Sequence, residues 1–194
     1  MVAARRAVLT GAPGAGKTTL VDAAAETGLS TSPEVARRLL REPGGMTLRE
    51  DDPLAFAEAM LAAYMVEYEN AARSGPGTVL FDRGFPDVAG FLDVSGLPVP
   101  PSVDKVCRAL RYHGPVFRAP AWAAIYSPDE ERIQDWAEAV ASDEAVTSAW
   151  RKYGYDPIAL PLSSVADRLA FIRARLAGWN QRTGAARPSS PTAC

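Results

Sequence analysis

The sequence has very few of the side chains that hold structural metals or form disulfide frameworks. Among its 194 residues there is one histidine, His113, and there are two cysteines, Cys107 and Cys194. No other histidine or cysteine stands at ligand spacing from His113, which argues against a metal cluster, and two cysteines do not make a disulfide framework. We therefore expect His113 to be structural or exposed.

An excess of positive charge and a long apolar run are also missing. The net charge is −2 and the pI is near 5.5, so the composition lacks the excess of positive charge that is typical of nucleic-acid-binding proteins. The apolar run after Arg5 and Arg6 is too short and too rich in glycine for a signal peptide, and no window approaches a membrane span. We expect a cytoplasmic protein that binds neither nucleic acid nor membrane.

The chain does contain a glycine-rich loop in a setting typical of phosphate binding. Residues 11–18 match the pattern G-x-x-x-x-G-K-[ST]. The apolar run 7–9 before the loop predicts a buried strand, and residues 19–26 after it predict a helix. The residues expected to bind the nucleotide are Gly11, Ala12, Pro13, Gly14, Ala15, Gly16, Lys17, Thr18 and Thr19.

This setting gives the residues of the loop defined chemical tasks. The glycines let successive backbone N–H groups turn toward an anion, and the helix N-terminus adds its partial positive charge. Lys17 would bridge the outer phosphates, and the Thr18 hydroxyl would bind Mg²⁺. A glycine-rich turn could match the pattern by accident, but the strand before it and the helix after it favour a nucleoside triphosphate site.

Strand and helix patterns alternate along the chain. Further strands are predicted at 29–32, 78–81, 116–117 and 156–160, and further helices at 34–41, 52–73, 87–94, 102–112, 127–153 and 165–179. This alternation predicts an α/β fold whose parallel sheet is covered by helices on both faces, with the phosphate loop at its carboxyl edge. We expect one domain over residues 1–180, and residues 181–194 have the composition of a disordered tail.

An aspartate and an arginine follow the strand pattern at 78–81. Asp82 stands where a Walker B acid would hold Mg²⁺ beside Thr18. Alternatively, Asp82 caps the turn that follows the strand. Arg83 could stabilise phosphate charge or bind an acidic substrate, or it could be an ordinary surface arginine.

Glu34 follows the second predicted strand, at the edge of the sheet that also carries the phosphate loop. From there it could accept the proton of an attacking hydroxyl or orient the acceptor. Alternatively, a glutamate in the first turn of a helix interacts with the helix dipole and pairs with Arg37 or Arg38.

A charged helical pattern around Arg132 suits a lid that closes over transferring phosphates. The alternative is a solvated helix in which Asp129 and Glu131 pair with nearby arginines.

Several stretches together resemble one family. The run 8–20, the run Pro33-Glu34-Val35-Ala36-Arg37-Arg38 and the run Phe81-Asp82-Arg83-Gly84-Phe85-Pro86-Asp87 resemble the small stand-alone AAA-type P-loop proteins related to the nicotinamide riboside kinase module. Residues 122–136 are similar to the lid of that family, and residues 154–172 to its C-terminal part. The resemblance runs from about residue 6 to residue 176.

The resemblance implies a P-loop NTPase three-layer sandwich, with a five-stranded parallel sheet in the order 2-3-1-4-5. We also expect an acceptor-binding helical insertion at about 33–73 and a helical lid at about 119–140, because a kinase reaction requires both to exclude water from the transfer. Family members often have an arginine directly after the lid tyrosine, where this chain has Ser127, and Arg118 is the candidate substitute. The residues that the resemblance places in one cleft are Glu34, Arg37, Asp82, Arg83 and Arg132.

These features predict an Mg-ATP-dependent phosphotransferase that moves the γ-phosphate to a hydroxyl of a small metabolite or natural product. Thr18 and Asp82 would hold the metal. The acceptor would lie against Glu34, Arg37 and Arg83. The residues expected to act in catalysis are Lys17, Glu34, Asp82 and Arg132.

A second hypothesis is a nucleotide switch or slow NTPase that acts through a protein or lipid partner and needs no acceptor pocket. Arg37, Arg38 and Arg41 beside the cleft suit either an anionic acceptor or a solvated helix face. The sequence leaves open the acceptor, the choice between ATP and GTP, and the oligomeric state, a homodimer included.

Overall fold

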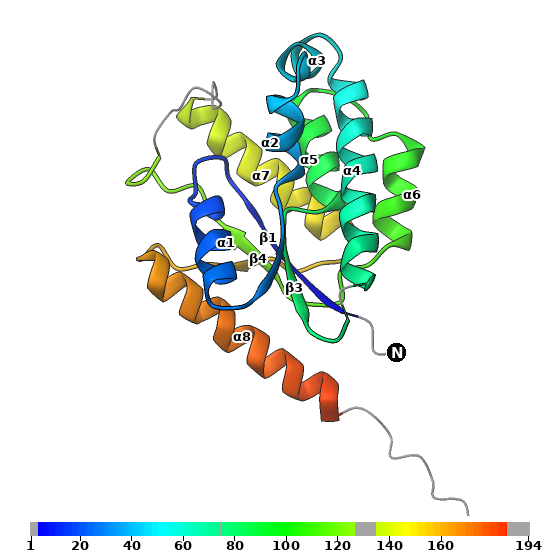
Figure 1. The fold of residues 1–194 in the computed structure, drawn as a ribbon. Helices are drawn as coiled ribbons and strands as arrows, with labels where there is room; N and C mark the ends of the chain where they lie inside the picture. The colour runs from blue at the N-terminus through cyan, green and yellow to red at the C-terminus, as the bar shows by residue number, and fades with distance from the viewer. Residues whose placement is uncertain (1–3, 74, 127–134, 186–194) are drawn as a thin grey trace, which may run out of the picture.

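The computed structural model describes residues 4–73, 75–126 and 135–185, and in it five parallel strands form one sheet (Figure 1). The strands lie in the order β2-β3-β1-β4-β5. This confirms the predicted fold class and strand order. Their bounds are β1 Arg5–Gly11, β2 Ser30–Ser32, β3 Thr78–Asp82, β4 Val116–Ala119 and β5 Ile158–Ala159.

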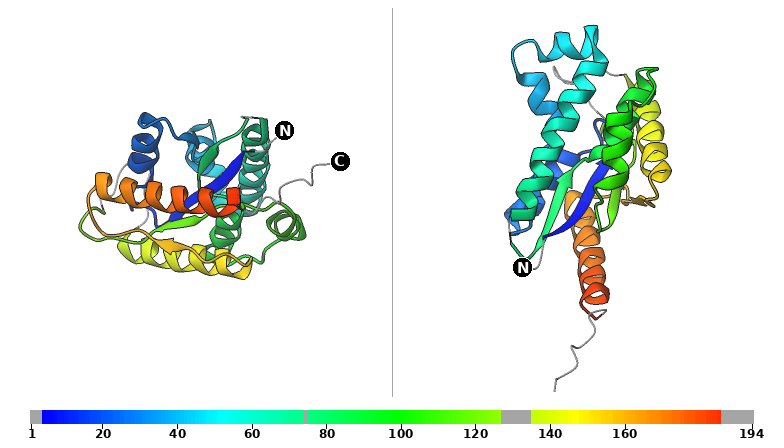
Figure 2. Two further views of the ribbon diagram at one scale, coloured as in Figure 1. Left: turned by 90° about the horizontal axis from the view of Figure 1, so that it is seen from below. Right: turned by 90° about the vertical axis from the view of Figure 1, so that its right-hand side faces the viewer.

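Helices cover both faces of the sheet, and β1 lies in the middle of the molecule in both views of Figure 2. Figure 1 shows α1 and α8 on one side and α4, α5 and α6 on the other. The helix bounds are α1 Lys17–Glu26, α2 Val35–Arg41, α3 Gly45–Asp51, α4 Pro53–Arg73, α5 Phe85–Val94, α6 Pro101–Ala109, α7 Trp136–Lys152 and α8 Val165–Ala185.

Two apolar clusters fill the space between the sheet and its helices, because side chains alternate between the faces of a strand. In β1, Ala7 and Leu9 join the cluster under α1 and α8. Val8, between them, joins the larger cluster under α4, α5 and α7. Strands buried on both faces explain why the sequence shows them as short continuous apolar runs.

Helix α3 was not predicted, because Pro43-Gly44-Gly45 reads as a stop signal. Helix α2 ends at Arg41, and Gly44, with a φ of 80°, is the N-cap of α3, which begins at Gly45. A Cβ on Gly45 would lie 2.0 Å from the Leu39 carbonyl oxygen, so the two helices meet at a distance that only glycine permits. In Figure 1, α2 and α3 project beyond the sheet near the start of α4.

The predicted end of the last helix at residue 179 is also wrong. Helix α8 continues to Ala185, into the segment that was expected to be disordered. Arg5 donates a hydrogen bond of 2.6 Å to the Asn180 side chain, and its guanidinium lies over the Trp179 ring. These contacts with β1 hold the helix beyond the predicted end.

The predicted helix at 127–153 corresponds to α7, which begins at Trp136. Asp135 caps α7, since its side chain accepts a hydrogen bond of 2.8 Å from the Glu138 N–H. Residues 127–134, which include Ser127 and most of the expected lid, lie outside the described part of the chain. No helix in the described ranges is both long enough and apolar enough to cross a bilayer.

Candidate active site

The loop between β1 and α1 has the geometry of a phosphate-binding loop. Gly14 and Gly16 both have a φ of 73°, and within the described chain no side chain caps the start of α1. The helix N-terminus therefore keeps N–H groups that can face an anion. Gly11 is needed for another reason, because a Cβ there would lie 2.1 Å from the Ala119 carbonyl oxygen of β4.

Lys17 lies folded back over this loop. Its ammonium group donates hydrogen bonds to the carbonyl oxygens of Gly11 at 3.1 Å and Ala12 at 2.5 Å. Burial, followed by the nearby charge of Arg83, lowers the pKa of Lys17 to about 7. A buried cation with a lowered pKa is well suited to gain an anionic partner.

Arg168 of α8 also contacts the loop, and it was noted in the sequence only as part of the family resemblance. Its guanidinium donates a hydrogen bond of 3.0 Å to the Ala15 carbonyl oxygen. The side chain is buried, and burial lowers the pKa of Arg168. This contact ties the loop to the opposite end of the chain.

Asp82 and Thr18 line a cavity of about 290 Å³ beside the loop, together with Asp22 and Glu34. Asp82 is 2% exposed, and its Oδ1 atom has no hydrogen-bond partner. Burial, followed by the charge of Glu34, raises the pKa of Asp82 to about 7.

An unpartnered carboxylate oxygen that lines the same cavity as a threonine suits Mg²⁺, which prefers hard oxygen ligands and keeps part of its water shell. Thr18 and Asp82 therefore fit the metal that the fold implies. Among the described residues no group of three or more His, Cys, Asp or Glu side chains could hold a metal alone. The phosphates of the nucleotide would have to complete the coordination.

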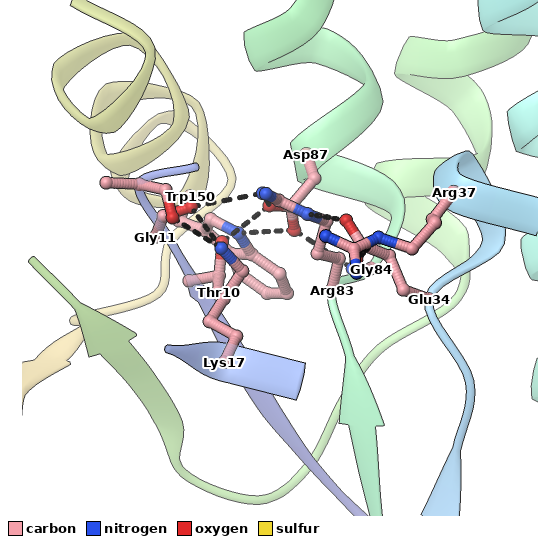
Figure 3. A network of polar contacts seen from close by, with 10 residues as sticks. Thr10, Gly11, Lys17, Glu34, Arg37, Arg83, Gly84, Asp87 and Trp150 are labelled. Carbon is pink, nitrogen blue, oxygen red and sulfur yellow. Dashed lines mark hydrogen bonds and ion pairs between the residues drawn. The ribbon is translucent and has the colours of Figure 1, made fainter. Parts of the chain in front are cut away.

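Glu34 is the N-cap of α2, directly after β2, and its carboxylate is held between two arginines (Figure 3). Arg83 Nε donates a hydrogen bond to it at 3.1 Å, and Arg37 Nε lies 3.5 Å away. Burial alone would raise the pKa of Glu34, but the charges of Arg83, Lys17 and Arg37 outweigh burial and lower it. Glu34 is therefore ionised at neutral pH.

Arg83 is not a surface side chain. Its guanidinium also donates hydrogen bonds to the Gly11 carbonyl oxygen at 3.1 Å and to Asp87 at 3.2 Å. Burial opposes the charge, but Glu34 and Asp87 outweigh it and raise the pKa of Arg83. In the described chain Arg83 is the one residue other than glycine with positive φ, at 70°. Such backbone strain is typical of functional sites.

Asp87 is the residue that the sequence reasoning missed. Its carboxylate accepts hydrogen bonds from the Thr10 hydroxyl, Arg83, the Gly84 N–H and the Trp150 indole, as Figure 3 shows. The bond from Gly84 satisfies the backbone N–H of the N-cap residue at the start of α5. The spacing Gly-x-x-Asp after a strand was the available signal. It is Asp87, and not Asp82, that caps this turn.

The remaining predicted positions are less central. Arg132 lies outside the described residues. Arg118 forms a two-bond ion pair with Asp143 of α7, at 2.9 and 2.6 Å. Arg38 pairs with Glu67 rather than with Glu34. His113 is exposed, as expected.

A larger cavity of about 500 Å³ begins at the phosphate loop and passes Glu34 and Arg83. It continues between α2, α4, α5 and α7, where Phe56, Met60 and Phe91 line it. Tyr64 of α4 also lines this cavity. The arrangement therefore places a phosphate site and a largely apolar chamber, which Arg49, Ser95 and Ser142 also border, in one continuous space.

The fold and this loop together define a P-loop NTPase of kinase-like architecture. A family model described as an AAA domain matches residues 6–168, and the chain belongs to that AAA domain family. This confirms the resemblance seen in the sequence. No curated protein matches the chain.

Several solved structures share the fold at low sequence identity. One is the deoxyadenosine kinase from M. mycoides with bound dATP, with a TM-score of 0.67, 13% identity, and coverage of 89% of this chain and 99% of that chain. Another is the NadR protein in complex with NR, with a TM-score of 0.66, 15% identity, and coverage of 90% and 51%. This chain therefore spans about half the length of NadR.

Proposed function

We propose that this protein is an Mg-ATP-dependent phosphotransferase that moves the γ-phosphate of ATP to a hydroxyl of a small molecule. The observation that carries the proposal is the continuous cavity of about 500 Å³ that joins the phosphate loop to a largely apolar chamber past Glu34 and Arg83. A kinase needs such an acceptor site next to the γ-phosphate, because water must be kept from the transfer. The kinases of similar fold agree with this reaction class.

Each residue of the site has a task in this reaction. The loop amides and Lys17 would bind the phosphates, and the negative charge that they bring favours the charged form of Lys17. Thr18 and Asp82 would hold Mg²⁺, which when bound neutralises charge on the β- and γ-phosphates. Transfer then depends mainly on positioning and on charge stabilisation.

Glu34 would accept the hydrogen bond of the acceptor hydroxyl and take its proton. A carboxylate with a lowered pKa is a weak base, but a loose phosphoryl-transfer transition state demands little of the base until late in the reaction. Arg83 fixes the position of Glu34, and its own position is fixed by Asp87. Arg37 and Arg83 border the acceptor, and Arg132 remains the proposed lid residue.

The experiment is phosphoryl transfer from Mg-ATP across a panel of nucleosides, aminoglycoside-like alcohols and phosphorylated sugars. We expect one class of compound to stimulate ATP consumption strongly in the wild type. Lys17→Ala should lose nucleotide binding as well as transfer. Glu34→Gln should lose transfer while it keeps its affinity for ATP.

Glu67→Gln is the matched control, since Glu67 pairs with Arg38 and does not border the described cavity. It should behave as the wild type. Slow ATP hydrolysis that no compound accelerates and that Glu34→Gln leaves unchanged would favour a nucleotide switch instead.

A further inference from the structure

The charged side chains in the acceptor part of the large cavity do not cancel. Beyond the phosphate loop and α1, three arginines and two carboxylates line the cavity, which leaves a net charge of +1. Arg83 pairs with Glu34 at 3.1 Å and with Asp87 at 3.2 Å, and Arg37 lies 3.5 Å from Glu34 (Figure 3). These four side chains balance one another. The excess charge is that of Arg49.

Arg49 lies at the end of the cavity that is remote from Glu34. Helix α2 begins directly after Glu34, and its seven residues lead away from it by about 10 Å, at about 1.5 Å per residue, before α3 begins. Helix α5 spans the cavity as well, since Asp87 in its first turn and Val94 at its end both line it. Arg49 and the ion-paired group at Glu34 are therefore separated by on the order of 10 Å.

The charge of Arg49 has no partner in the protein. The side chain is half-buried, and it forms no hydrogen bond or ion pair with the residues that the structure describes. The end of α5 does not use this charge either. The carbonyl oxygens of Phe91, Leu92 and Asp93 there each accept a backbone hydrogen bond of 2.9 or 3.0 Å. A cation that lines a cavity without a partner is suited to an anionic ligand.

An apolar stretch separates the two polar ends of the cavity. Leu40, Phe56, Met60 and Phe91 line it. Phe56 of α4 and Phe91 of α5 meet edge to face, with ring centroids 5.5 Å apart. This stretch suits the uncharged body of a ligand whose two ends are polar.

We infer that the acceptor carries a carboxylate, which Arg49 binds at the far end of the cavity while the reacting hydroxyl meets Glu34. One arginine without a partner balances one carboxylate, and its planar guanidinium can donate two parallel hydrogen bonds to it. A phosphate monoester carries about −1.5 to −2 at neutral pH and would exceed that charge. The inference rests on the proposed phosphotransferase function and deepens it, because it names the acceptor class as a hydroxy acid with an apolar body.

A series of straight-chain hydroxy acids tests the charge and the spacing together. The probes are 6-hydroxyhexanoate, 8-hydroxyoctanoate and 10-hydroxydecanoate, each with its uncharged primary amide. Binding to the full chain is measured by ligand-observed NMR with Mg²⁺ and a non-hydrolysable ATP analogue, which fill the phosphate loop so that a carboxylate cannot bind there. Phosphoryl transfer from Mg-ATP is measured separately by mass spectrometry of the product. We expect at least one acid to bind roughly five- to thirtyfold more tightly than its own amide.

Arg49→Gln removes the charge and keeps a polar side chain. We expect it to reduce the advantage of the acid to about twofold or less, and to leave the Kd of the amide unchanged. Arg49→Lys keeps the charge and should retain most of the advantage. Arg73→Gln is the matched control, because it makes the same change of net charge at an exposed arginine that pairs with Glu69 and does not border the described cavity. It should behave as the wild type.

The two readouts distinguish failure of the inference from failure of the proposed function. Binding of an acid that depends on Arg49, without transfer to any probe, would support the carboxylate site and contradict the kinase. Absence of binding by all three acids, equal binding of each acid and its amide, or an acid preference that Arg49→Gln leaves unchanged would overturn the inference. Transfer to the amides or to other alcohols would then leave the kinase in place.

Discussion

Replacing Asp87 by asparagine should destabilise the protein because it disrupts the network that holds Arg83. The Oδ1 atom of Asp87 accepts hydrogen bonds from Thr10 at 2.5 Å and from Arg83 at 3.2 Å. Its Oδ2 atom accepts from Gly84 at 2.9 Å and from Trp150 at 3.0 Å. The donors come from three parts of the fold, since Arg83 and Gly84 are adjacent whereas Thr10 lies in β1 and Trp150 in α7, so no single local shift can replace the carboxylate.

The expected loss follows from the two orientations of an asparagine amide. If its NH₂ group faces Gly84 and Trp150, two buried N–H donors lose their acceptor. If it faces Thr10 and Arg83, the Thr10 hydroxyl can rotate and accept, so mainly the Arg83 bond is lost. Arg83 keeps its ion pair with Glu34. We therefore expect the free energy of unfolding to fall by about 2–4 kcal/mol, which is less than for a buried charge left without any partner.

Urea unfolding of the nucleotide-free protein at neutral pH measures this loss. The control is Asp104→Asn, at a partly exposed carboxylate that pairs with Arg108 and accepts a hydrogen bond from Tyr153, and it should change stability much less. A free energy of unfolding within about 0.5 kcal/mol of the wild type would refute the network's role, since that is the range of neutral surface changes.

Three further changes test other parts of the structure. Burial and the charge of Glu34 raise the pKa of Asp82 from 3.8 to about 7. Between these two pH values the folded state binds more protons than the unfolded state, so the free energy of unfolding falls as the pH rises from about 4 to about 7. Asp82→Asn should therefore stabilise the nucleotide-free protein near pH 8 and not near pH 4, and identical urea midpoints for both proteins near pH 8 would contradict this. Tyr64→Phe should raise the melting temperature, because it removes a buried hydroxyl without a partner; a lower melting temperature would show that the hydroxyl is satisfied. Gly90→Ala should lower the free energy of unfolding by about 1–3 kcal/mol, because the alanine Cβ would lie 2.7 Å from the Val146 Cα where α5 packs on α7. An unchanged urea midpoint would contradict this close packing.

Much of the fold could be predicted from local signals in the sequence. The phosphate loop combines a buried strand, glycines and a helix within a short segment, and the fully apolar strands point to a parallel sheet. The order of the strands came from the family resemblance. Helix α3 was missed because glycine pairs usually end helices, whereas Gly45 here permits close packing on α2.

The site was only partly predictable, because its organisation depends on contacts between distant residues. Asp87 bonds to Thr10 and Trp150, which are 77 and 63 positions away in the chain. The local spacing Gly-x-x-Asp indicates only the bond to Gly84 and not these two distant bonds. Tyr64 fits the helical period of α4 as an apolar residue, and only the three-dimensional structure shows that its hydroxyl lacks a partner.

The most direct test of the phosphotransferase proposal follows the γ-phosphate itself. ATP labelled isotopically at the γ-phosphate is incubated with Mg²⁺, a small-molecule extract and the full chain, and the products are separated by mass. The account predicts a labelled phosphate ester formed by the wild type but not by Lys17→Ala or Glu34→Gln. Label that appears only in inorganic phosphate, at the same rate in the wild type and in Glu34→Gln, would contradict it.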